Sequence, residues 1–479
     1  MNRTFACLLV FLISTTAAAQ YGDVSFANTG SADAQPAFSR GLALLHDFEY
    51  SAAAEAFRDA QKIDPDFVMA YWGEAMTYTH PVWYQQDADA ARAVLQRLGA
   101  TKAKSDREQA YLETVKVLYG DGSKEERDNK YAERMAALHQ KYPDDVDATA
   151  FYALSLLGTS HNGRDTATYM RAAALLEDVF PTHQHHPGVL HYLIHSYDDP
   201  VHAPLGMRAA RLYGAVAPNA GHALHMTSHI FIAMGMWDDV IDANVRAIRV
   251  VNAQRTAAGK SALHCGHYPT WLHYALLQKG MVEAAKKLLD ACRADAPTGS
   301  EMIVTSYADM VASQAMSGIS VEAGFSPPEK YADARFTLAY ADAYDAYRRR
   351  DAAALRDAAA RLRAARTEHT GHADMAMGMN NPQAPQRQAV IIQEIEGMEL
   401  AVAGKREEAV AAFRKAAAAE QSMPFDFGPP FIEKPALELL GDELLAMKRN
   451  DEAATAYRAA LARTPGRAVV VEGLRASTK

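Results

Sequence analysis

The chain has little of several features that mark common classes of protein. Only 3 of its 479 residues are cysteine, too few for disulfide bonds to replace a hydrophobic core. Lysine and arginine (49) are outnumbered by aspartate and glutamate (58) and form no basic cluster, which argues against binding to nucleic acid or an anionic membrane. Past the N-terminus, no apolar run approaches the roughly 18 residues of a membrane-spanning helix. We therefore expect neither a nucleic-acid partner nor a membrane span.

The composition is that of a large protein with a packed core. Hydrophobic residues make up 49% of the chain and charged residues 22%, which excludes a disordered or collagen-like chain. Alanine is abundant, whereas glycine (28) and proline (20) are modest. This balance favours packed helices.

Residues 1–19 have the pattern of a secretory signal peptide. Arg3 supplies a positive charge, an apolar run extends from Phe5 to Ile13, and three alanines precede Gln20 as a cleavage site. We expect the mature chain to begin at Gln20 and to be periplasmic or secreted. Two cysteines, Cys265 and Cys292, then remain, and export permits a disulfide between them as readily as two free thiols.

The last part of the chain carries a repeat signature. When Lys434 is counted as position 1, large and small residues follow at fixed positions: Leu440 (7), Gly441 (8), Ala453 (20), Tyr457 (24), Ala460 (27) and Pro465 (32). This resembles the tetratricopeptide-repeat (TPR) pattern, a helix-turn-helix of about 34 residues. The second half of the pattern recurs at Ala53, Phe57, Ala60 and Pro65, and again at Ala409, Phe413 and Ala416.

Helical periodicity continues between these repeats, and strand-like alternation is absent. The sequence therefore predicts an all-α, TPR-like helical-repeat solenoid, in which each unit buries its face on its neighbours. We expect two halves, an N-terminal solenoid over 20–317 and a C-terminal solenoid over 318–479. An insertion with aromatic and proline residues, Met423–Phe431, precedes the last repeat and is expected either to fold across the concave face or to seal the end of the solenoid.

Histidines are concentrated in the middle of the chain and follow the repeat. A helix is expected between His186 and Pro200, with His191 and His195 four residues apart on one face. One repeat length later, His225 and His229 have the same spacing, and His222 lies one turn before them. The next unit contributes His267. In the TPR pattern these positions resemble the row that lines the concave groove, so we expect the imidazoles of neighbouring helices to converge.

Converging imidazoles favour a transition-metal site. Neutral imidazole is the commonest metal ligand, and a histidine pair at i, i+4 is spaced to chelate an ion. The predicted ligands are His191, His195, His222, His225, His229 and His267. Asp198 and Asp199 are expected as further ligands or as acceptors that orient an imidazole. The alternative is a groove of polar side chains that binds a peptide or small molecule without metal.

Copper is favoured over zinc as the metal. Affinity for nitrogen ligands peaks at Cu²⁺, and an exported location and softer groups elsewhere add weight. Those softer groups are the alternating Met375, Met377 and Met379, next to His372, and a thiolate of Cys265 if it is not in a disulfide. The methionines fit equally well as a linker that covers an apolar patch.

Three segments, His80–Trp83, His186–His195 and His222–Phe231, resemble those of a group of exported bacterial TPR proteins with a histidine-rich groove. The resemblance covers most of the mature chain and implies the fold and the histidine row, but no reaction. The sequence thus leads to an exported TPR protein with a histidine-built copper or zinc site, which is a metalloenzyme if one coordination position is open. A metal-free scaffold for a protein partner is the alternative function.

Overall fold

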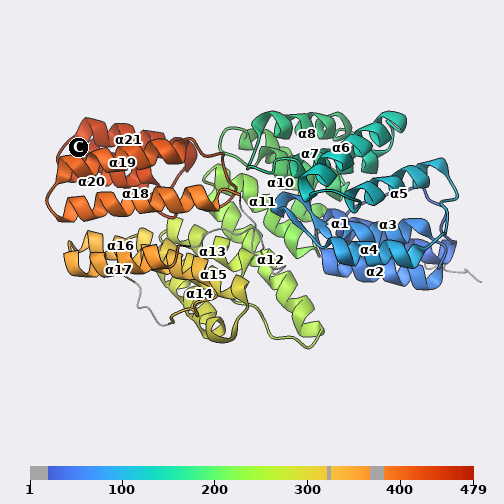
Figure 1. Ribbon diagram of the computed structural model, residues 1–479, viewed down its shortest axis with the longest axis horizontal. Coiled ribbons are helices and arrows are strands. Elements are labelled where there is room, and N and C mark those ends of the chain that lie inside the picture. The colour runs from blue at the N-terminus through green and yellow to red at the C-terminus, as the bar shows by residue number, and fades with distance from the viewer. Residues whose placement is uncertain (1–19, 321–324, 367–381, 479) are drawn as a thin grey trace, which may run out of the picture.

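The computed structural model describes residues 20–320, 325–366 and 382–478, and the predicted signal peptide lies outside the described residues. Within these ranges nearly all regular structure is helical, so the predicted all-α, TPR-like solenoid is confirmed. Nearly every helix packs against the next one along the chain, and successive pairs stack side by side (Figure 1).

The bounds of the first ten α-helices are α1 (Gln35–His46), α2 (Tyr50–Ile63), α3 (Val68–Met76), α4 (Ala88–Leu98), α5 (Asp106–Leu118), α6 (Lys124–Lys141), α7 (Val146–Gly158), α8 (Thr166–Val179), α9 (Pro187–Tyr197) and α10 (Ala203–Val216). The shorter elements are η2 (Ala32–Ala34), β1 (Thr79–His80), η3 (Pro81–Trp83), β2 (Gln85–Gln86) and η4 (Ala296–Thr298). The two short strands pair antiparallel.

The remaining helices are α11 (Gly221–Ala233), α12 (Trp237–Ala257), α13 (His267–Gln278), α14 (Val282–Asp295), α15 (Glu301–Met316), α16 (Ala332–Arg348), α17 (Ala352–Ala364), α18 (Ala384–Val402), α19 (Arg406–Gln421), α20 (Ala436–Ala446), α21 (Asn450–Arg463) and α22 (Ala468–Ser477). No helix in the described part of the chain combines the length and the apolar character needed to cross a membrane.

The repeat pattern explains how the paired helices approach one another. Gly441, at position 8, faces the Tyr457 ring at position 24 so closely that an added Cβ would lie 2.6 Å from it. A Cβ at Gly397 would likewise lie 2.5 Å from Phe413, which occupies the same position in its own repeat. Small residues at position 8 are therefore required by the aromatic residue of the second helix.

The C-terminal repeats return to the middle of the chain. The indole of Trp237 donates to Gly466 O (3.0 Å), and Arg467 donates to the hydroxyl of Tyr274 (2.9 Å). In Figure 1, α11 to α13 accordingly lie between the N-terminal helices on the right and the C-terminal helices on the left. The predicted division of the solenoid at residue 318 stays a prediction.

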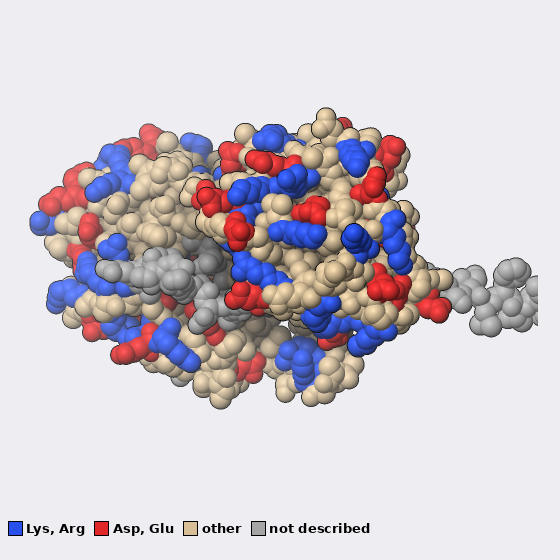
Figure 2. Space-filling view, turned by 45° about the vertical axis from the view of Figure 1, so that its right-hand side comes forward, with Lys and Arg blue, Asp and Glu red and all other residues tan. Residues whose placement is uncertain are grey.

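Surface charge is mixed on the face of the molecule shown in Figure 2. Lysine and arginine side chains lie among aspartate and glutamate side chains there rather than forming one basic patch. Cys265 and Cys292 form a disulfide, which ties the segment before α13 to α14. Cys265 therefore supplies no thiolate, and one of the two sequence alternatives for it is resolved.

Candidate metal centre

Three first helices of successive units, α9, α11 and α13, carry the histidines that the sequence singled out. The helix expected between His186 and Pro200 forms as α9. His186 caps it, because its Nδ1 accepts the backbone N–H of Val189 at 3.3 Å, and Pro187 occupies the first turn. The i, i+4 pairs in α9 and α11 lie on the same side of the solenoid, with the imidazole centroids of His195 and His229 5.4 Å apart.

The structure brings all six predicted histidines together in one group, which we call the histidine ring: His191, His195, His222, His225, His229 and His267. Five of the six are at most 5% exposed, and His267 is partly buried. Neighbouring ring centroids are close, for example 4.9 Å between His191 and His195 and 4.5 Å between His225 and His267.

The ligand atoms of the histidine ring fall into two sets of three. The first set is His191, His195 and His222, and the second set is His225, His229 and His267. Within each set, one ligand nitrogen from each residue lies within 4.8 Å of the others. Each set therefore combines ligands from two neighbouring helices.

The nitrogens of the first set have an orientation suited to metal binding. The Nδ1 of His191 donates to the backbone oxygen of His46 (2.6 Å), and the Nδ1 of His195 donates to Asp198 Oδ2 (3.3 Å). In a neutral imidazole the other nitrogen then carries a lone pair. The Nε2 atoms of His191, His195 and His222 are all buried and have no hydrogen-bond partner.

The second set brings two lone pairs face to face. The Nδ1 of His225 donates to Asn244 Oδ1 (2.7 Å), and the amide of Asn244 is oriented by its own donation to Val240 O (2.9 Å). The Nδ1 of His229 donates to Asp198 Oδ2 (2.9 Å). The two Nε2 atoms lie 3.2 Å apart. Because each neutral imidazole has used its proton on Nδ1, neither Nε2 has a proton to share.

Burial keeps the ring imidazoles neutral. It lowers the pKa of His191 to about 3 and that of His267 to about 4. The pKa values of the other four ring histidines lie well below the ordinary value, through burial first and repulsion from neighbouring imidazoles second. At neutral pH the ring therefore presents lone pairs rather than positive charges.

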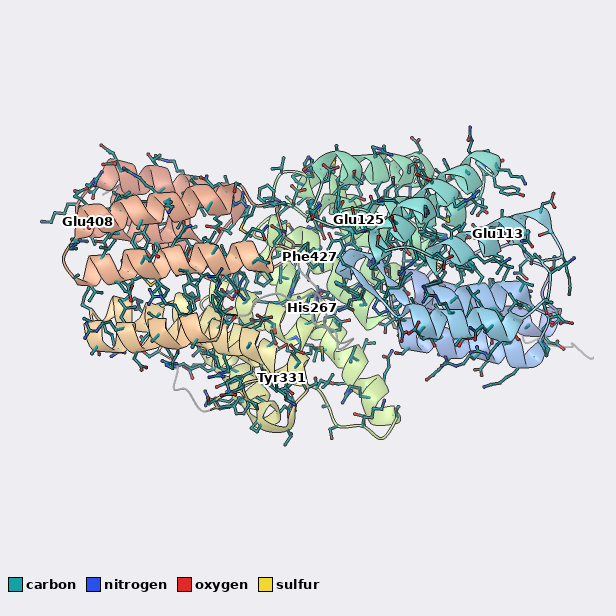
Figure 3. The ribbon with its side chains drawn as sticks, in the orientation of Figure 1. Glu113, Glu125, His267, Tyr331, Glu408 and Phe427 are labelled. Atoms are coloured by element: carbon teal, nitrogen blue, oxygen red, sulfur yellow. A yellow bond between two sulfur atoms is a disulfide. The ribbon has the colours of Figure 1, made fainter. Side chains whose placement is uncertain are left out.

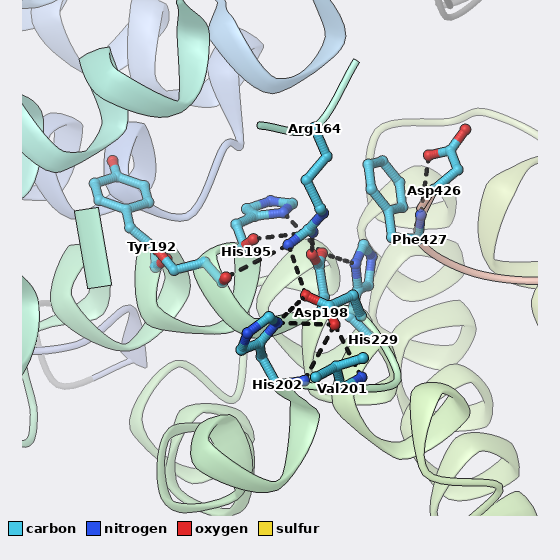
Figure 4. Close-up of polar contacts among 11 residues, drawn as sticks. Arg164, Tyr192, His195, Asp198, Val201, His202, His229, Asp426 and Phe427 are labelled. Atoms are coloured by element: carbon cyan, nitrogen blue, oxygen red, sulfur yellow. Dashed lines mark hydrogen bonds and ion pairs between the residues drawn. The ribbon is translucent and has the colours of Figure 1, made fainter. Parts of the chain in front are cut away.

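Asp198, which follows α9, orients one histidine of each set. A single oxygen, Oδ2, accepts from both His195 and His229, while Arg164 forms an ion pair with Oδ1 (Figure 4). Asp199 has a separate role: it accepts from His202 Nδ1 (2.8 Å) and pairs with Arg164 (3.3 Å). A carboxylate behind an imidazole fixes its tautomer and raises its basicity toward a metal.

Aromatic side chains contact both sets of the histidine ring. Phe48 and Trp83 contact the first set, with centroids 4.2 Å from His191 and 5.6 Å from His222. Trp271 and Phe427 contact His229 of the second set, at 4.6 and 4.9 Å. Phe427 belongs to the insertion Met423–Phe431, which therefore reaches the histidine-bearing face of the solenoid, and Figure 3 places it near His267 in the middle of the molecule.

Several contributors were missed by sequence reasoning. His46 and Phe48 come from the N-terminal repeat, far from the histidines in sequence, and Asn244 lies on a second helix whose residues carry no metal-ligand signature. Another buried carboxylate, that of Glu394, lies in the C-terminal repeats and accepts from the Tyr340 hydroxyl (2.6 Å). The methionines Met375, Met377 and Met379 and their neighbour His372 lie outside the described residues.

A second buried cluster contacts the first set through His46, and its imidazole nitrogens are used differently. We call His46, Asp147 and His186 the buried triad. Asp147 Oδ1 accepts from Nε2 of His46 (2.9 Å) and of His186 (3.2 Å). The remaining nitrogen of His46 lies 3.0 Å from the Tyr192 hydroxyl, and that of His186 accepts the Val189 amide. All four imidazole nitrogens are thus hydrogen-bonded.

Comparison with known proteins yields fold-level likeness alone. No protein-family model matches the chain, and no curated protein matches it. Similar solved structures include the APC/C hetero-tetramer Cut9–Hcn1 (13% identity, covering 95% of this chain and 78% of that chain, TM-score 0.37). The P58(IPK) TPR domain (13% identity, 93% and 98%, TM-score 0.23) and yeast Tom70 (9% identity, 93% and 88%, TM-score 0.32) are also similar.

Proposed function

We propose that this protein is an exported TPR-like metalloprotein whose histidine ring binds copper. The observation that carries the proposal is the pair of Nε2 atoms of His225 and His229, 3.2 Å apart, each with its Nδ1 already bonded to an acceptor. Buried acceptors that face one another without a proton cost free energy, about 1–3 kcal/mol for each unsatisfied group. A cation between them turns this repulsion into two bonds.

The separation of the two nitrogens suits a common ion. Nitrogens bound to one ion at about 2.0–2.1 Å, with angles of roughly 90–110° at the metal, lie about 2.9–3.4 Å apart. The 3.2 Å between His225 and His229 falls within this range. The first set offers three more Nε2 atoms with no competing hydrogen bond.

Copper is the metal that this donor set favours. Imidazole suits copper and zinc alike, but affinity for nitrogen ligands is highest for Cu²⁺. Three nitrogens at a set leave a coordination position open, as in catalytic rather than structural sites. We therefore place the protein among metalloenzymes, with zinc as the second choice of metal.

The metal-free alternative gives the histidines the role of contacting a protein or peptide partner in the groove. Repeat solenoids present extended concave surfaces suited to such partners. Five of the six ring histidines are at most 5% exposed, however, and Phe427 lies against them. A peptide in the groove would not reach these imidazoles, so they are better suited to an ion than to a partner chain.

Metal analysis of protein purified without an affinity tag tests the proposal. We expect bound copper by elemental mass spectrometry, and we expect both His195→Ala and His229→Ala to hold less copper than the wild type while retaining helical content by circular dichroism. His185→Ala is the matched control, because His185 is exposed and lies outside the ring. Protein that binds no metal after reconstitution with copper or zinc leaves only the partner-binding scaffold.

Export is tested on the same preparation. We expect the mass of protein recovered from the periplasm or medium to lack residues 1–19. An intact N-terminus on cytoplasmic protein would contradict the exported part of the proposal without affecting the metal site.

A further inference from the structure

We infer that the histidine ring holds two copper ions, one in each set, and that the two ions share one small ligand. This inference rests on the proposed function, since it specifies the number of ions and the class of ligand at the same site.

The grouping of the nitrogens points to two ions rather than one. An ion about 2.0–2.1 Å from each of its ligands binds nitrogens no more than about 4.2 Å apart. Among the described residues, the ring nitrogens that meet even a 4.8 Å limit form sets of three, and all six ring histidines belong to one set or the other. A further grouping of His195, Asp198 and His229 uses Nδ1 atoms, which already donate to the carboxylate.

The two sets are close enough to form one centre. His195 of the first set and His229 of the second have ring centroids 5.4 Å apart, and His222 and His225 are 6.1 Å apart. The distances within the first set are similar, at 4.9 and 5.1 Å. Asp198 Oδ2 also orients one imidazole of each set. Paired metal ions in such sites typically lie about 3.5–4 Å apart and clamp a common ligand.

The surroundings limit the shared ligand to a small molecule. A cavity of about 40 Å³ lies beside the ring, and its lining includes Trp83, Tyr84, Arg164 and Phe427. The ring histidines do not line this cavity themselves, but two of its lining residues contact them: Trp83 contacts the first set and Phe427 the second. A space of this size holds one or a few water-sized molecules. Hydroxide, azide or a diatomic molecule fits there, whereas a larger organic molecule does not.

Copper content and electron paramagnetic resonance (EPR) of the full chain loaded with Cu²⁺ test the inference. We expect two copper ions per chain with an EPR signal far below that of the same copper released in acid, because a shared ligand couples the two spins. His222→Ala removes a ligand of the first set alone, and His267→Ala removes one of the second set alone. Each is expected to halve the copper content and yet raise the EPR signal to about one spin per chain.

Azide is the probe for the shared ligand. Its absorption bands with bound Cu²⁺ should saturate at one azide per chain in the wild type, with His185→Ala unchanged. His222→Gln serves as a second variant if His222→Ala fails to fold.

One copper per chain in the wild type overturns the inference but leaves the proposed function intact, and no copper overturns both. Two copper ions with full, uncoupled EPR signals and two independent azides would contradict the shared ligand.

Discussion

Two buried clusters of histidine lie next to each other in this molecule, and they differ in how their nitrogens are used. In the buried triad, all four imidazole nitrogens of His46 and His186 have hydrogen-bond partners. In the histidine ring, the Nδ1 atoms of His191, His195, His225 and His229 are bonded to oxygen, while their Nε2 atoms have no N–H or O–H donor. The two histidines of the triad and five of the six in the ring are equally buried, at no more than 5% exposed. The buried triad, whose nitrogens are all hydrogen-bonded, stabilises the fold, whereas the histidine ring has unpaired nitrogens that can bind a cation.

The triad also shows how the two clusters are connected. His46 bonds Asp147 through its side chain, and its backbone oxygen accepts from His191 of the ring. Burial lowers the pKa of His46 to about 4. Burial alone would raise the pKa of Asp147, but hydrogen bonds from His186 and His46 hold it below the ordinary value. Two imidazoles bonded to one carboxylate thus fix α1 against α7 and the start of α9.

The largest expected effect is a loss of folding stability when the buried triad is broken. Asp147→Ala leaves two buried imidazole N–H groups without an acceptor, so we expect a loss of about 3–5 kcal/mol of stability. Chemical denaturation followed by circular dichroism measures it. The exposed neighbour Asp144 provides the control, and Asp144→Ala should change stability by less than about 0.5 kcal/mol. A loss below about 1 kcal/mol for Asp147→Ala would show that the triad is not a structural network.

Metal removal should act on the ring alone. Copper that binds the folded chain stabilises it by about 2.7 kcal/mol when free copper exceeds the dissociation constant a hundredfold. We expect this gain in thermal unfolding of the wild type and of Asp144→Ala, and its loss after chelation. His229→Ala, which loses a ligand of the second set and keeps the first, should show a smaller gain than the wild type. An equal copper response in His229→Ala would assign the binding to another site.

Asp198 and Asp199 provide a closer comparison, because both pair with Arg164 but only Asp198 bonds ring histidines. Loss of a carboxylate behind a ligating imidazole typically weakens metal binding 10- to 100-fold. We expect Asp198→Asn to weaken copper binding by about that factor in competition with a chelator. Asp199→Asn, which affects His202 instead, should stay within about twofold. Equal effects of the two variants would mean that the ion pair with Arg164, rather than the tautomer of the ring imidazoles, determines the copper affinity.

Local patterns in the sequence were sufficient to predict the helices and the convergence of the ring. Position 8 is small in the repeats because the aromatic residue at position 24 leaves no room for a side chain, and this is visible at Gly441 and Tyr457. The 34-residue spacing that relates His191 to His225 likewise follows from stacking of equal units. Both features depend on residues within one or two repeats.

Contacts that depend on the path of the whole superhelix could not be predicted in this way. His46 is 145 residues from His191, and its contribution is a backbone oxygen, which no residue pattern marks. Phe427 reaches His229 because the small rotations between many repeats add up to bring the C-terminal part back to α11. Asn244 lies on a neighbouring helix, where an asparagine facing a histidine is indistinguishable in sequence from any other polar residue.

A lone buried histidine isolates the effect of burial from that of clustering. His273 in α13 is fully buried and belongs to neither cluster, and burial lowers its pKa to about 4. In the unfolded chain its pKa is near 6.5, so the unfolded state binds more protons between these values. Its contribution to stability is therefore fully present above pH 6.5 and is lost as the pH falls toward 4. Between pH 7 and pH 5, we expect this residue to account for a loss on the order of 1–2 kcal/mol.

His273→Leu should remove that loss, so that denaturation curves at pH 7 and pH 5 lie closer together than in the wild type. His185→Ala, an exposed histidine, should keep the wild-type difference. If His273→Leu also keeps it, the acid sensitivity of the chain comes from the clustered histidines, those of the ring together with His46. Copper, which competes with protons for those nitrogens, would then suppress the sensitivity more in the wild type than in His229→Ala.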